Sequence, residues 1–284
     1  MTIDPQRLLD WPIADAHQDY DERDCILYAL GLGFGGDPLD PRQLRHVYEC
    51  DLVPFPSVAL VLAAGPRWAS DPATGIDYAK VVHAEQSFTL ARPLPPRGSV
   101  RSKSKVSAIV DKGAGRGAIV SSERALYFDQ DDAPTAVLSS SLFCRGDGGF
   151  GGQASPSEPR APLPDSAPDV CVTLDIPHNL ALLYRLSGDM NPLHADPAVA
   201  AAAGFRAPIL HGLSSFGLAL RATIEGVDIL PTAVTGAGVR FTGPVYPGET
   251  IMTEVWRQAD RLAFRSRVPA RNALVLDHGW IRHD

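Results

Sequence analysis

A stretch rich in glycine and proline divides this 284-residue chain into two parts of similar length. Between Gly146 and Pro168 lie five glycines, five prolines and three serines in 23 residues, a composition that cannot build a packed core. A chain of this length can hold two domains of ordinary size. The stretch therefore predicts two domains, residues 1–145 and 169–284, joined by a linker at 146–168.

The same order of sequence features recurs on both sides of this linker. Each half is predicted to begin with a helix, continue into a glycine-containing turn and a long buried helix, and end in strands that alternate apolar and polar residues. The matching segments are the helices 24–30 and 179–187, the apolar runs 58–64 and 213–222, and the alternating stretches 99–110 and 249–256. We interpret the chain as a diverged tandem duplication of one unit that combines helix and antiparallel sheet.

The composition excludes several classes of protein. A net charge of -7 argues against a general nucleic-acid surface, because neutralising phosphates requires concentrated lysine and arginine. The four cysteines are scattered without a Cys-x-x-Cys pair, so they predict reduced thiols rather than a disulfide framework or a thiolate metal site. The amino-terminal residues lack the apolar core of a signal peptide, and no apolar run approaches the roughly 20 residues of a membrane span. We expect a cytoplasmic protein with no membrane or nucleic-acid partner.

Seven residues of the second half, Gly188 to His194, place a carboxylate, a carboxamide and an imidazole on one short loop. Gly188 permits unusual backbone angles and Pro192 stops a continuous helix, so Asp189 and His194 can turn toward one point. This arrangement suits an acid/base pair that activates water, and Asn191 supplies an amide that can fix the carboxylate or the water. The corresponding turn of the first half lacks the histidine, so only the second half is expected to be catalytic.

Two helices are predicted to begin after this loop in the chain. Asp196 is a good N-cap for a short helix that ends near Gly204, which pins His194 between two helices. Gly212 lies at the start of the apolar helix, where its backbone N–H has no partner within the helix and can donate to a carbonyl oxygen that gains negative charge. A polarised carbonyl beside a water-activating pair predicts reversible hydration of a conjugated double bond.

The residues of the loop and its surroundings resemble a known family, the R-specific enoyl-CoA hydratases, also called hydratase 2 or the MaoC-like dehydratase group. The long motif from Tyr184 to Asp196 carries the resemblance most specifically. Further similar segments are 204–213 and 244–250 in the second half and 27–33, 44–49 and 83–86 in the first, which resemble the two-domain, eukaryotic-type members. The resemblance therefore covers nearly the whole chain.

This resemblance implies an α+β double hot-dog fold, in which each half wraps an antiparallel sheet around a long central helix. It implies interconversion of trans-2-enoyl-CoA and (3R)-3-hydroxyacyl-CoA, with Asp189 and His194 as the catalytic pair and the Gly212 N–H as oxyanion donor. The first half would then make room for the acyl chain. An acyl-CoA thioester is the expected substrate, hydration requires no cofactor because coenzyme A is part of that substrate, and we expect a homodimer.

A further set of residues is expected to bind the rest of the substrate. They are Gly188, Arg206, His211, Arg240, Lys103 and Lys105, with Lys112 and Arg116 beside the lysines. The basic side chains are candidates for the CoA phosphates, yet charges at alternating strand positions more often form a solvated face. His211 precedes the oxyanion glycine, and a structural role that orients the loop is favoured for it.

Other interpretations of individual residues were weighed against these. Asp189, His194 and Asp196 have the residue types of a metal site, but the usual His-x-x-x-His helix spacing is absent, so no metal is predicted. In the first half, His83, Glu85 and Gln86 are expected to form hydrogen bonds at a sheet edge.

Two other functions remain open. A thioesterase or another acyl-thioester dehydratase of the same fold class would act on CoA or carrier-protein thioesters, and hydrolysis would release a free thiol. A non-catalytic acyl-CoA binding protein would show affinity without turnover, and replacing Asp189 by alanine would leave it unchanged.

Overall fold

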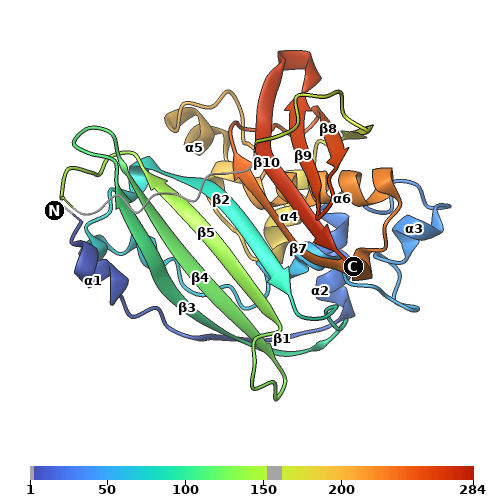
Figure 1. Ribbon diagram of the computed structural model, residues 1–284, viewed down its shortest axis with the longest axis horizontal. Coiled ribbons are helices and arrows are strands. Elements are labelled where there is room, and N and C mark those ends of the chain that lie inside the picture. Colours follow the sequence, from blue (N-terminus) through green and yellow to red (C-terminus); the bar gives the residue numbers. More distant parts are fainter. Residues whose placement is uncertain (1–2, 152–161) are drawn as a thin grey trace.

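The computed structural model describes residues 3–151 and 162–284 and is dominated by one curved antiparallel sheet (Figure 1). Its strands are β1 (Ala16–Tyr20), β2 (Val81–Leu90), β3 (Gly98–Asp111), β4 (Ala118–Phe128), β5 (Ala136–Cys144), β6 (Val170–Asp175), β7 (Val234–Phe241), β8 (Thr250–Arg257), β9 (Leu262–Val268) and β10 (Ala273–His283). Their order in the sheet is β1-β3-β4-β5-β2-β7-β10-β9-β8-β6. The predicted strands 99–110 and 249–256 are confirmed as β3 and β8.

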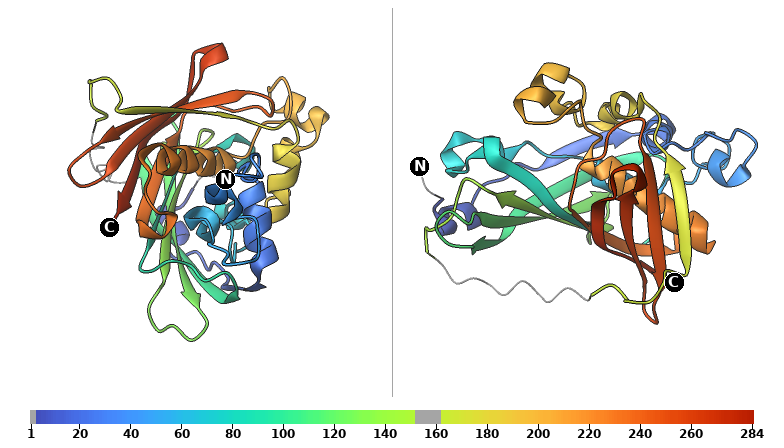
Figure 2. Two further views of the ribbon diagram at one scale, coloured as in Figure 1. Left: turned by 90° about the vertical axis from the view of Figure 1, so that its right-hand side faces the viewer. Right: turned by 90° about the horizontal axis from the view of Figure 1, so that it is seen from above.

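The helices are short, with one exception. The α-helices are α1 (Pro5–Leu9), α2 (Glu22–Leu30), α3 (Pro41–Leu44), α4 (Leu180–Tyr184), α5 (Pro197–Ala202) and α6 (Gly212–Val227). Short 3-10 helices are η1 (Pro56–Leu60), η2 (Trp68–Ser70), η3 (Pro72–Thr74), η4 (Tyr78–Lys80), η5 (Arg185–Ser187), η6 (Pro192–His194), η7 (Pro231–Ala233) and η8 (Pro269–Arg271). Figure 2 shows the second-half strands curling around α6, with α2 and α4 on the same side of the sheet. In the part of the chain that the structure describes, no helix has the length and apolarity to span a bilayer.

The two halves share this sheet because β2 of the first half pairs with β7 of the second. The register runs from Glu85 opposite Arg240 to Thr89 opposite Gly236. β2 is therefore an interior strand with β5 on its other side, and the expectation of a sheet edge at His83, Glu85 and Gln86 is wrong. Sequence alternation did not reveal this position, because the pairing joins segments about 150 residues apart in the chain.

A long central helix is present in the second half only. The predicted helix 213–222 is confirmed as α6, a 16-residue helix in which most side chains are buried. The predicted long helix 58–64 is wrong: the segment forms the five-residue 3-10 helix η1 and stays buried without continuing. Ala63 adopts a φ of 44°, which a right-handed helix does not accommodate.

Helix α6 packs in a hydrophobic core that contains residues of both halves. Phe216 contacts Phe88 of β2, with ring centroids 6.2 Å apart, and the Ser214 hydroxyl donates to the carbonyl of Gly31 after α2. The largest cluster of buried apolar residues accordingly contains side chains from both halves. The long helix of the second half is thus held in place partly by the first half.

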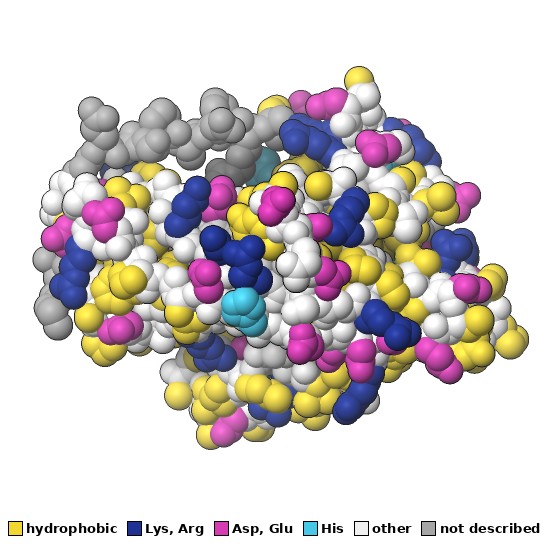
Figure 3. Space-filling view, turned by 90° about the horizontal axis from the view of Figure 1, so that it is seen from below, with side chains coloured by type: hydrophobic (Ala, Val, Ile, Leu, Met, Phe, Trp, Pro, Cys, Tyr) yellow, Lys and Arg dark blue, Asp and Glu magenta, His cyan; other side chains and the backbone are white. Residues whose placement is uncertain are grey.

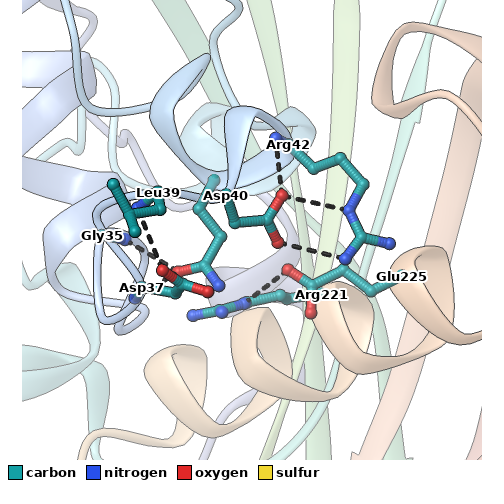
Figure 4. A network of polar contacts seen from close by, with 8 residues as sticks. Gly35, Asp37, Leu39, Asp40, Arg42, Arg221 and Glu225 are labelled. Atoms are coloured by element: carbon teal, nitrogen blue, oxygen red, sulfur yellow. Dashed lines mark hydrogen bonds and ion pairs between the residues drawn. The ribbon is translucent and has the colours of Figure 1, made fainter.

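A polar network at the far end of α6 adds a second tie (Figure 4). The Arg221 side chain is 6% exposed, and its Nη1 donates to the Leu32 carbonyl at 3.2 Å while its Nε pairs with Glu225 at 2.9 Å. Its guanidinium also lies 4.3 Å from the centroid of the Phe34 ring. Because a buried cation must be paired and hydrogen-bonded, this residue fixes the loop after α2 against α6.

The predicted linker, 146–168, lies between β5 and β6, and part of it, 152–161, lies outside the described residues. The domain bounds therefore stay a prediction, as do the homodimer and the cytoplasmic location. Among the described residues the four cysteines are unpaired, with Cys25 and Cys144 buried and Cys50 and Cys171 exposed. On the face drawn in Figure 3, basic and acidic side chains are interspersed rather than gathered by sign.

Candidate functional site

The loop between α4 and α5 is shaped by local backbone signals. Gly188 has a φ of 118° and ends η5, a conformation that a residue with a Cβ adopts only under strain. Asn191 caps the single turn η6, because its Oδ1 accepts from the Leu193 N–H at 3.1 Å. Asp196 caps α5 through the N–H groups of Ala198 and Val199. The loop is therefore held at both ends by caps, and the Asp189 and His194 side chains stay available for chemistry.

The carboxylate of Asp189 and the imidazole of His194 lie on the same side of this loop. Oδ2 of Asp189 is 4.0 Å from Nε2 of His194. Oδ1 accepts from the backbone N–H of Asn191 at 3.1 Å, so Asn191 fixes the carboxylate through its main chain rather than its amide. The aspartate side chain is 47% exposed and the histidine side chain 9%. One group thus reaches solvent while the other is shielded from it.

Hydrogen bonding determines which nitrogen of His194 carries the proton. Nδ1 lies 2.8 Å from the carbonyl oxygen of Ile209. Because a carbonyl oxygen only accepts, Nδ1 is the protonated nitrogen of the neutral ring, and Nε2 directs a lone pair toward Asp189. Burial lowers the pKa of His194, while the Ile209 carbonyl and Asp189 act in the opposite direction. The ring is therefore neutral near pH 7 and able to accept a proton.

His211 lies against His194 and connects the loop to helix α6. The two rings stack with centroids 3.7 Å apart and planes inclined by 25°. Nε2 of His211 donates to the backbone carbonyl of Asp189 at 3.1 Å, and its Nδ1 is buried without a hydrogen-bond partner among the described residues. Burial, followed by the neighbouring His194, lowers the pKa of His211. A neutral His211 thus holds the main chain of Asp189 beside the start of α6.

Gly212 is the first residue of α6, as the sequence predicts. His211 precedes it as N-cap with an extended backbone, φ -59° and ψ 138°. A Cβ at position 212 would lie 3.3 Å from the Phe241 ring, so the glycine lets that ring cover the helix start closely. The first N–H groups of a helix have no intrahelical acceptor and lie at its positive end. The geometry allows a substrate oxygen to be bound there.

His83 of β2 borders the same region from the first half. Its ring lies 4.8 Å from that of Phe241, and its Nε2 is 3.0 Å from the Ser140 hydroxyl of β5. Burial lowers the pKa of His83 to about 4, and the negative charge of Asp189 is near enough to oppose this shift. His83 is therefore a neutral wall residue near the site rather than an edge group.

A cavity of about 240 Å³ opens beside the loop and is lined by both halves. Its walls include Leu27, Val58, Val61 and Leu62 from the first half and Leu186, Ser187 and Gly188 from the second. Segment 58–64, which was expected to be a long helix, thus contributes apolar side chains to the wall. Gln18 and Asp24 also line the cavity, so its wall is mixed in polarity, and the loop that begins at Gly188 lies at its border.

The basic residues expected to bind CoA are not gathered at the loop. Arg206 pairs with Glu249 at 2.9 Å and lies over the Tyr246 ring, and Arg240 is exposed on β7. Lys103 and Lys105 alternate on β3 with buried residues, so they point away from the core. Lys105 pairs there with Glu123 of β4 at 3.1 Å, and Lys103 lies over the Tyr127 ring. Among the predicted substrate residues, Gly188 and His211 are the two that the structure places beside Asp189 and His194.

Three side chains of the site lie close enough together to hold a metal ion. The set differs from the one considered from the sequence, because His211 takes the place of Asp196. Ligand atoms of Asp189, His194 and His211 lie within 4.8 Å of one another. The side chain of Asp196 is instead occupied in capping α5.

Arg67 is a charged neighbour of Asp189 that the sequence did not indicate. Its Nη2 donates to Oδ1 of Asp189 at 3.1 Å, although the two residues are 122 positions apart. No local motif surrounds Arg67, and a single arginine between a Gly-Pro turn and a tryptophan gives no sequence signal of its role. Only the packing of the halves brings it to the loop.

Comparisons with known proteins match both halves. Residues 160–277 match the family described as MaoC like domain, and residues 18–146 the family described as MFE-2 hydratase 2 N-terminal domain. The enoyl-CoA hydratase ChsH3 of Mycobacterium tuberculosis is 39% identical over 282 residues, covering 97% of this chain and 97% of that protein.

Two solved structures bear on the fold. The crystal structure of a MaoC-like dehydratase from Phytophthora capsici superposes with a TM-score of 0.87 at 31% identity, covering 99% of this chain and 98% of that one. A Mycobacterium tuberculosis protein described as having a double hot-dog fold superposes with a TM-score of 0.56 at 15% identity, covering 97% of each chain. The predicted α+β double hot-dog fold is confirmed, with the long helix retained in one half.

Proposed function

The chain belongs to the two-domain MaoC-like enoyl-CoA hydratase family and is a hydratase or dehydratase, and we propose that its second half adds water to trans-2-enoyl-CoA to give (3R)-3-hydroxyacyl-CoA. One observation carries the mechanism: the unprotonated Nε2 of His194 faces Oδ2 of Asp189 across 4.0 Å. At this separation one water oxygen can lie about 2.8 Å from both atoms. That water is oriented by the carboxylate and loses its proton to the pair as it adds.

The thioester carbonyl is activated at the start of α6. Its oxygen accepts a hydrogen bond from the Gly212 N–H, which draws electrons from the conjugated double bond and makes the β carbon electrophilic. The water oxygen bonds to the β carbon, the water proton passes to the Asp189 and His194 pair, and a proton is delivered from this pair to the α carbon. The sum is addition of one water without oxidation, so the proposed reaction needs no cofactor apart from the CoA of its substrate.

The acyl chain is assigned to the cavity beside the loop, and the first half contributes much of its apolar wall. Val58, Val61 and Leu62 give this space an apolar side that a hydrocarbon chain can contact, while Gln18 and Asp24 make the rest of the wall polar. The first half therefore provides room for the substrate while the second half provides the proton-transfer groups.

The proposal is tested with crotonyl-CoA, following the loss of enoyl absorbance and the chirality of the 3-hydroxy product. Asp189→Ala and His194→Ala should each abolish hydration while the circular dichroism spectrum stays unchanged, because both groups hold the same water. Wild-type turnover in either variant would contradict the mechanism, and an S product would contradict the stereochemistry. Release of free CoA thiol would show that the protein is a thioesterase. Saturable binding without turnover would show that it is a binding protein.

A further inference from the structure

The two oxygens of the Asp189 carboxylate have different partners. Oδ1 accepts from Nη2 of Arg67 and from the Asn191 backbone N–H, each at 3.1 Å, whereas Oδ2 faces Nε2 of His194. A carboxylate held through one oxygen by two donors cannot rotate freely about its terminal bond. The remaining oxygen is thereby aimed at the imidazole.

The segment that carries Arg67 is fixed by its own hydrogen bonds. The Arg67 carbonyl accepts from both the backbone N–H of Ser70 at 2.9 Å and the Ser70 hydroxyl at 2.7 Å, and Trp68 packs against the smaller apolar cluster of the first half. The Trp68 N–H bonds to the carbonyl of Pro66 at 2.8 Å. The backbone at position 67 is therefore anchored while its side chain reaches out to the loop of the other half.

Stabilisation of the fold does not account for this contact. The Arg67 and Asp189 side chains are 52% and 47% exposed, and exposed ion pairs contribute little to stability. Its effect is local, because orientation of reacting groups strongly affects rate even where it adds little binding energy.

We propose that Arg67 is a positioning residue of the reaction, which holds Oδ1 of Asp189 so that Oδ2 and His194 Nε2 share one water. The inference rests on the proposed hydration. It gives the first half a part in catalysis in addition to room for the acyl chain.

The charges around His194 predict a second consequence. The titratable and charged groups near it are Asp189 on its own loop, His211 at the start of α6 and Arg67 from the first half, with Arg185 and His83 beyond them. Among these, the positive charge of Arg67 lowers the pKa of His194 and Asp189 raises it. Removing the arginine charge should therefore shift the acidic limb of the rate profile to higher pH.

The test compares Arg67→Gln, which keeps a donor without the charge, with Arg67→Lys, which keeps the charge. Arg92→Gln is the matched control, since Arg92 is exposed to a similar degree, 48% against 52% for Arg67, and forms an ion pair with Asp131 in the same half at 2.7 Å. The full-length variants are assayed from acidic to neutral pH with crotonyl-CoA and with crotonyl-pantetheine, which lacks the nucleotide phosphates.

We expect Arg67→Gln to lower kcat about tenfold with both substrates, with KM changed by less than about twofold. The acidic limb of its pH–rate profile should lie at higher pH than that of the wild type. The limb of Arg67→Lys should lie at the wild-type position. Arg92→Gln should match the wild type in kcat, KM and pH profile. Wild-type kcat and pH profile in Arg67→Gln would overturn the inference. So would a KM increase confined to crotonyl-CoA, which would instead assign Arg67 to a CoA phosphate. A wild-type protein without hydratase activity would refute the proposed function itself, which is a different outcome.

Discussion

Replacing Gly212 by proline removes the backbone N–H at the first position of α6 and adds a side chain beside Phe241. Proline is tolerated at the first position of a helix, where its ring suits the backbone and the missing N–H has no intrahelical acceptor. The residue before proline must be extended, and His211 already has φ -59° and ψ 138°. The helix should therefore form normally in this variant, and an effect on rate would report on the donor.

The size of the effect follows from the proposed role of this donor. Loss of one oxyanion-hole donor costs about 10² to 10³ in kcat, or roughly 2.7–4 kcal/mol. Both Gly212→Pro and Gly212→Ala introduce a Cβ that would lie 3.3 Å from the Phe241 ring. The alanine variant retains the N–H, so the ratio of the two rates separates the donor from the steric contact.

Crotonyl-CoA hydration by both variants is the assay, with urea unfolding to show that each is folded. We expect Gly212→Ala to lose less than about tenfold and Gly212→Pro at least about 10² relative to it. A folded proline variant whose kcat lies within a few-fold of the alanine variant would refute the assignment of the Gly212 N–H as oxyanion donor.

Four further outcomes follow from charge and burial. Because burial lowers the pKa of His194, its neutral, proton-accepting form persists below pH 6.5, so kcat/KM plotted against pH should begin to fall only under that value. Burial lowers the pKa of His46 to about 4, so as pH falls below 6.5 the unfolded chain binds a proton at this residue before the folded chain does. In urea titrations, the free energy of unfolding should fall between neutral pH and pH 5 by about 2 kcal/mol more in the wild type than in His46→Gln. Arg221→Met should lower the free energy of unfolding by about 2–4 kcal/mol, because the Leu32 carbonyl and Glu225 lose their buried partner. An unchanged urea midpoint would contradict this. Double replacement of Lys103 and Lys105 by glutamine should leave KM for crotonyl-CoA unchanged, since both point away from the core, and a severalfold increase in KM would place CoA on that face.

The parts of the molecule that local chemistry determines could be predicted from the sequence. Caps and turns depend on residues a few positions apart, so the loop from Gly188, the helix start at Asp196 and the helix beginning at Gly212 follow from their neighbours. The helix expected at 58–64 does not form, because η1 ends at Leu60 and the left-handed backbone of Ala63 interrupts the segment. Apolar content alone did not distinguish a buried turn from a buried helix.

Features that depend on the approach of distant segments could not be predicted. The position of β2 inside the sheet, and with it His83, requires the partner β7 to be known. The outward direction of Lys103 follows only when the buried face of β3 is identified, since alternation alone allows either face. Arg67 has no motif, and its contact with Asp189 is a result of tertiary packing.

The pairing of β2 with β7 has a consequence for any attempt to divide the protein. Separating the halves would leave each with a bare strand edge of unpaired N–H and C=O groups, together with the apolar side chains that α6 now covers in both. Fragments ending on either side of the linker should thus be poorly soluble alone, yet they carry mutually complementary edges and should reassociate when refolded together. The shared sheet and core therefore predict that each half needs the other in order to fold.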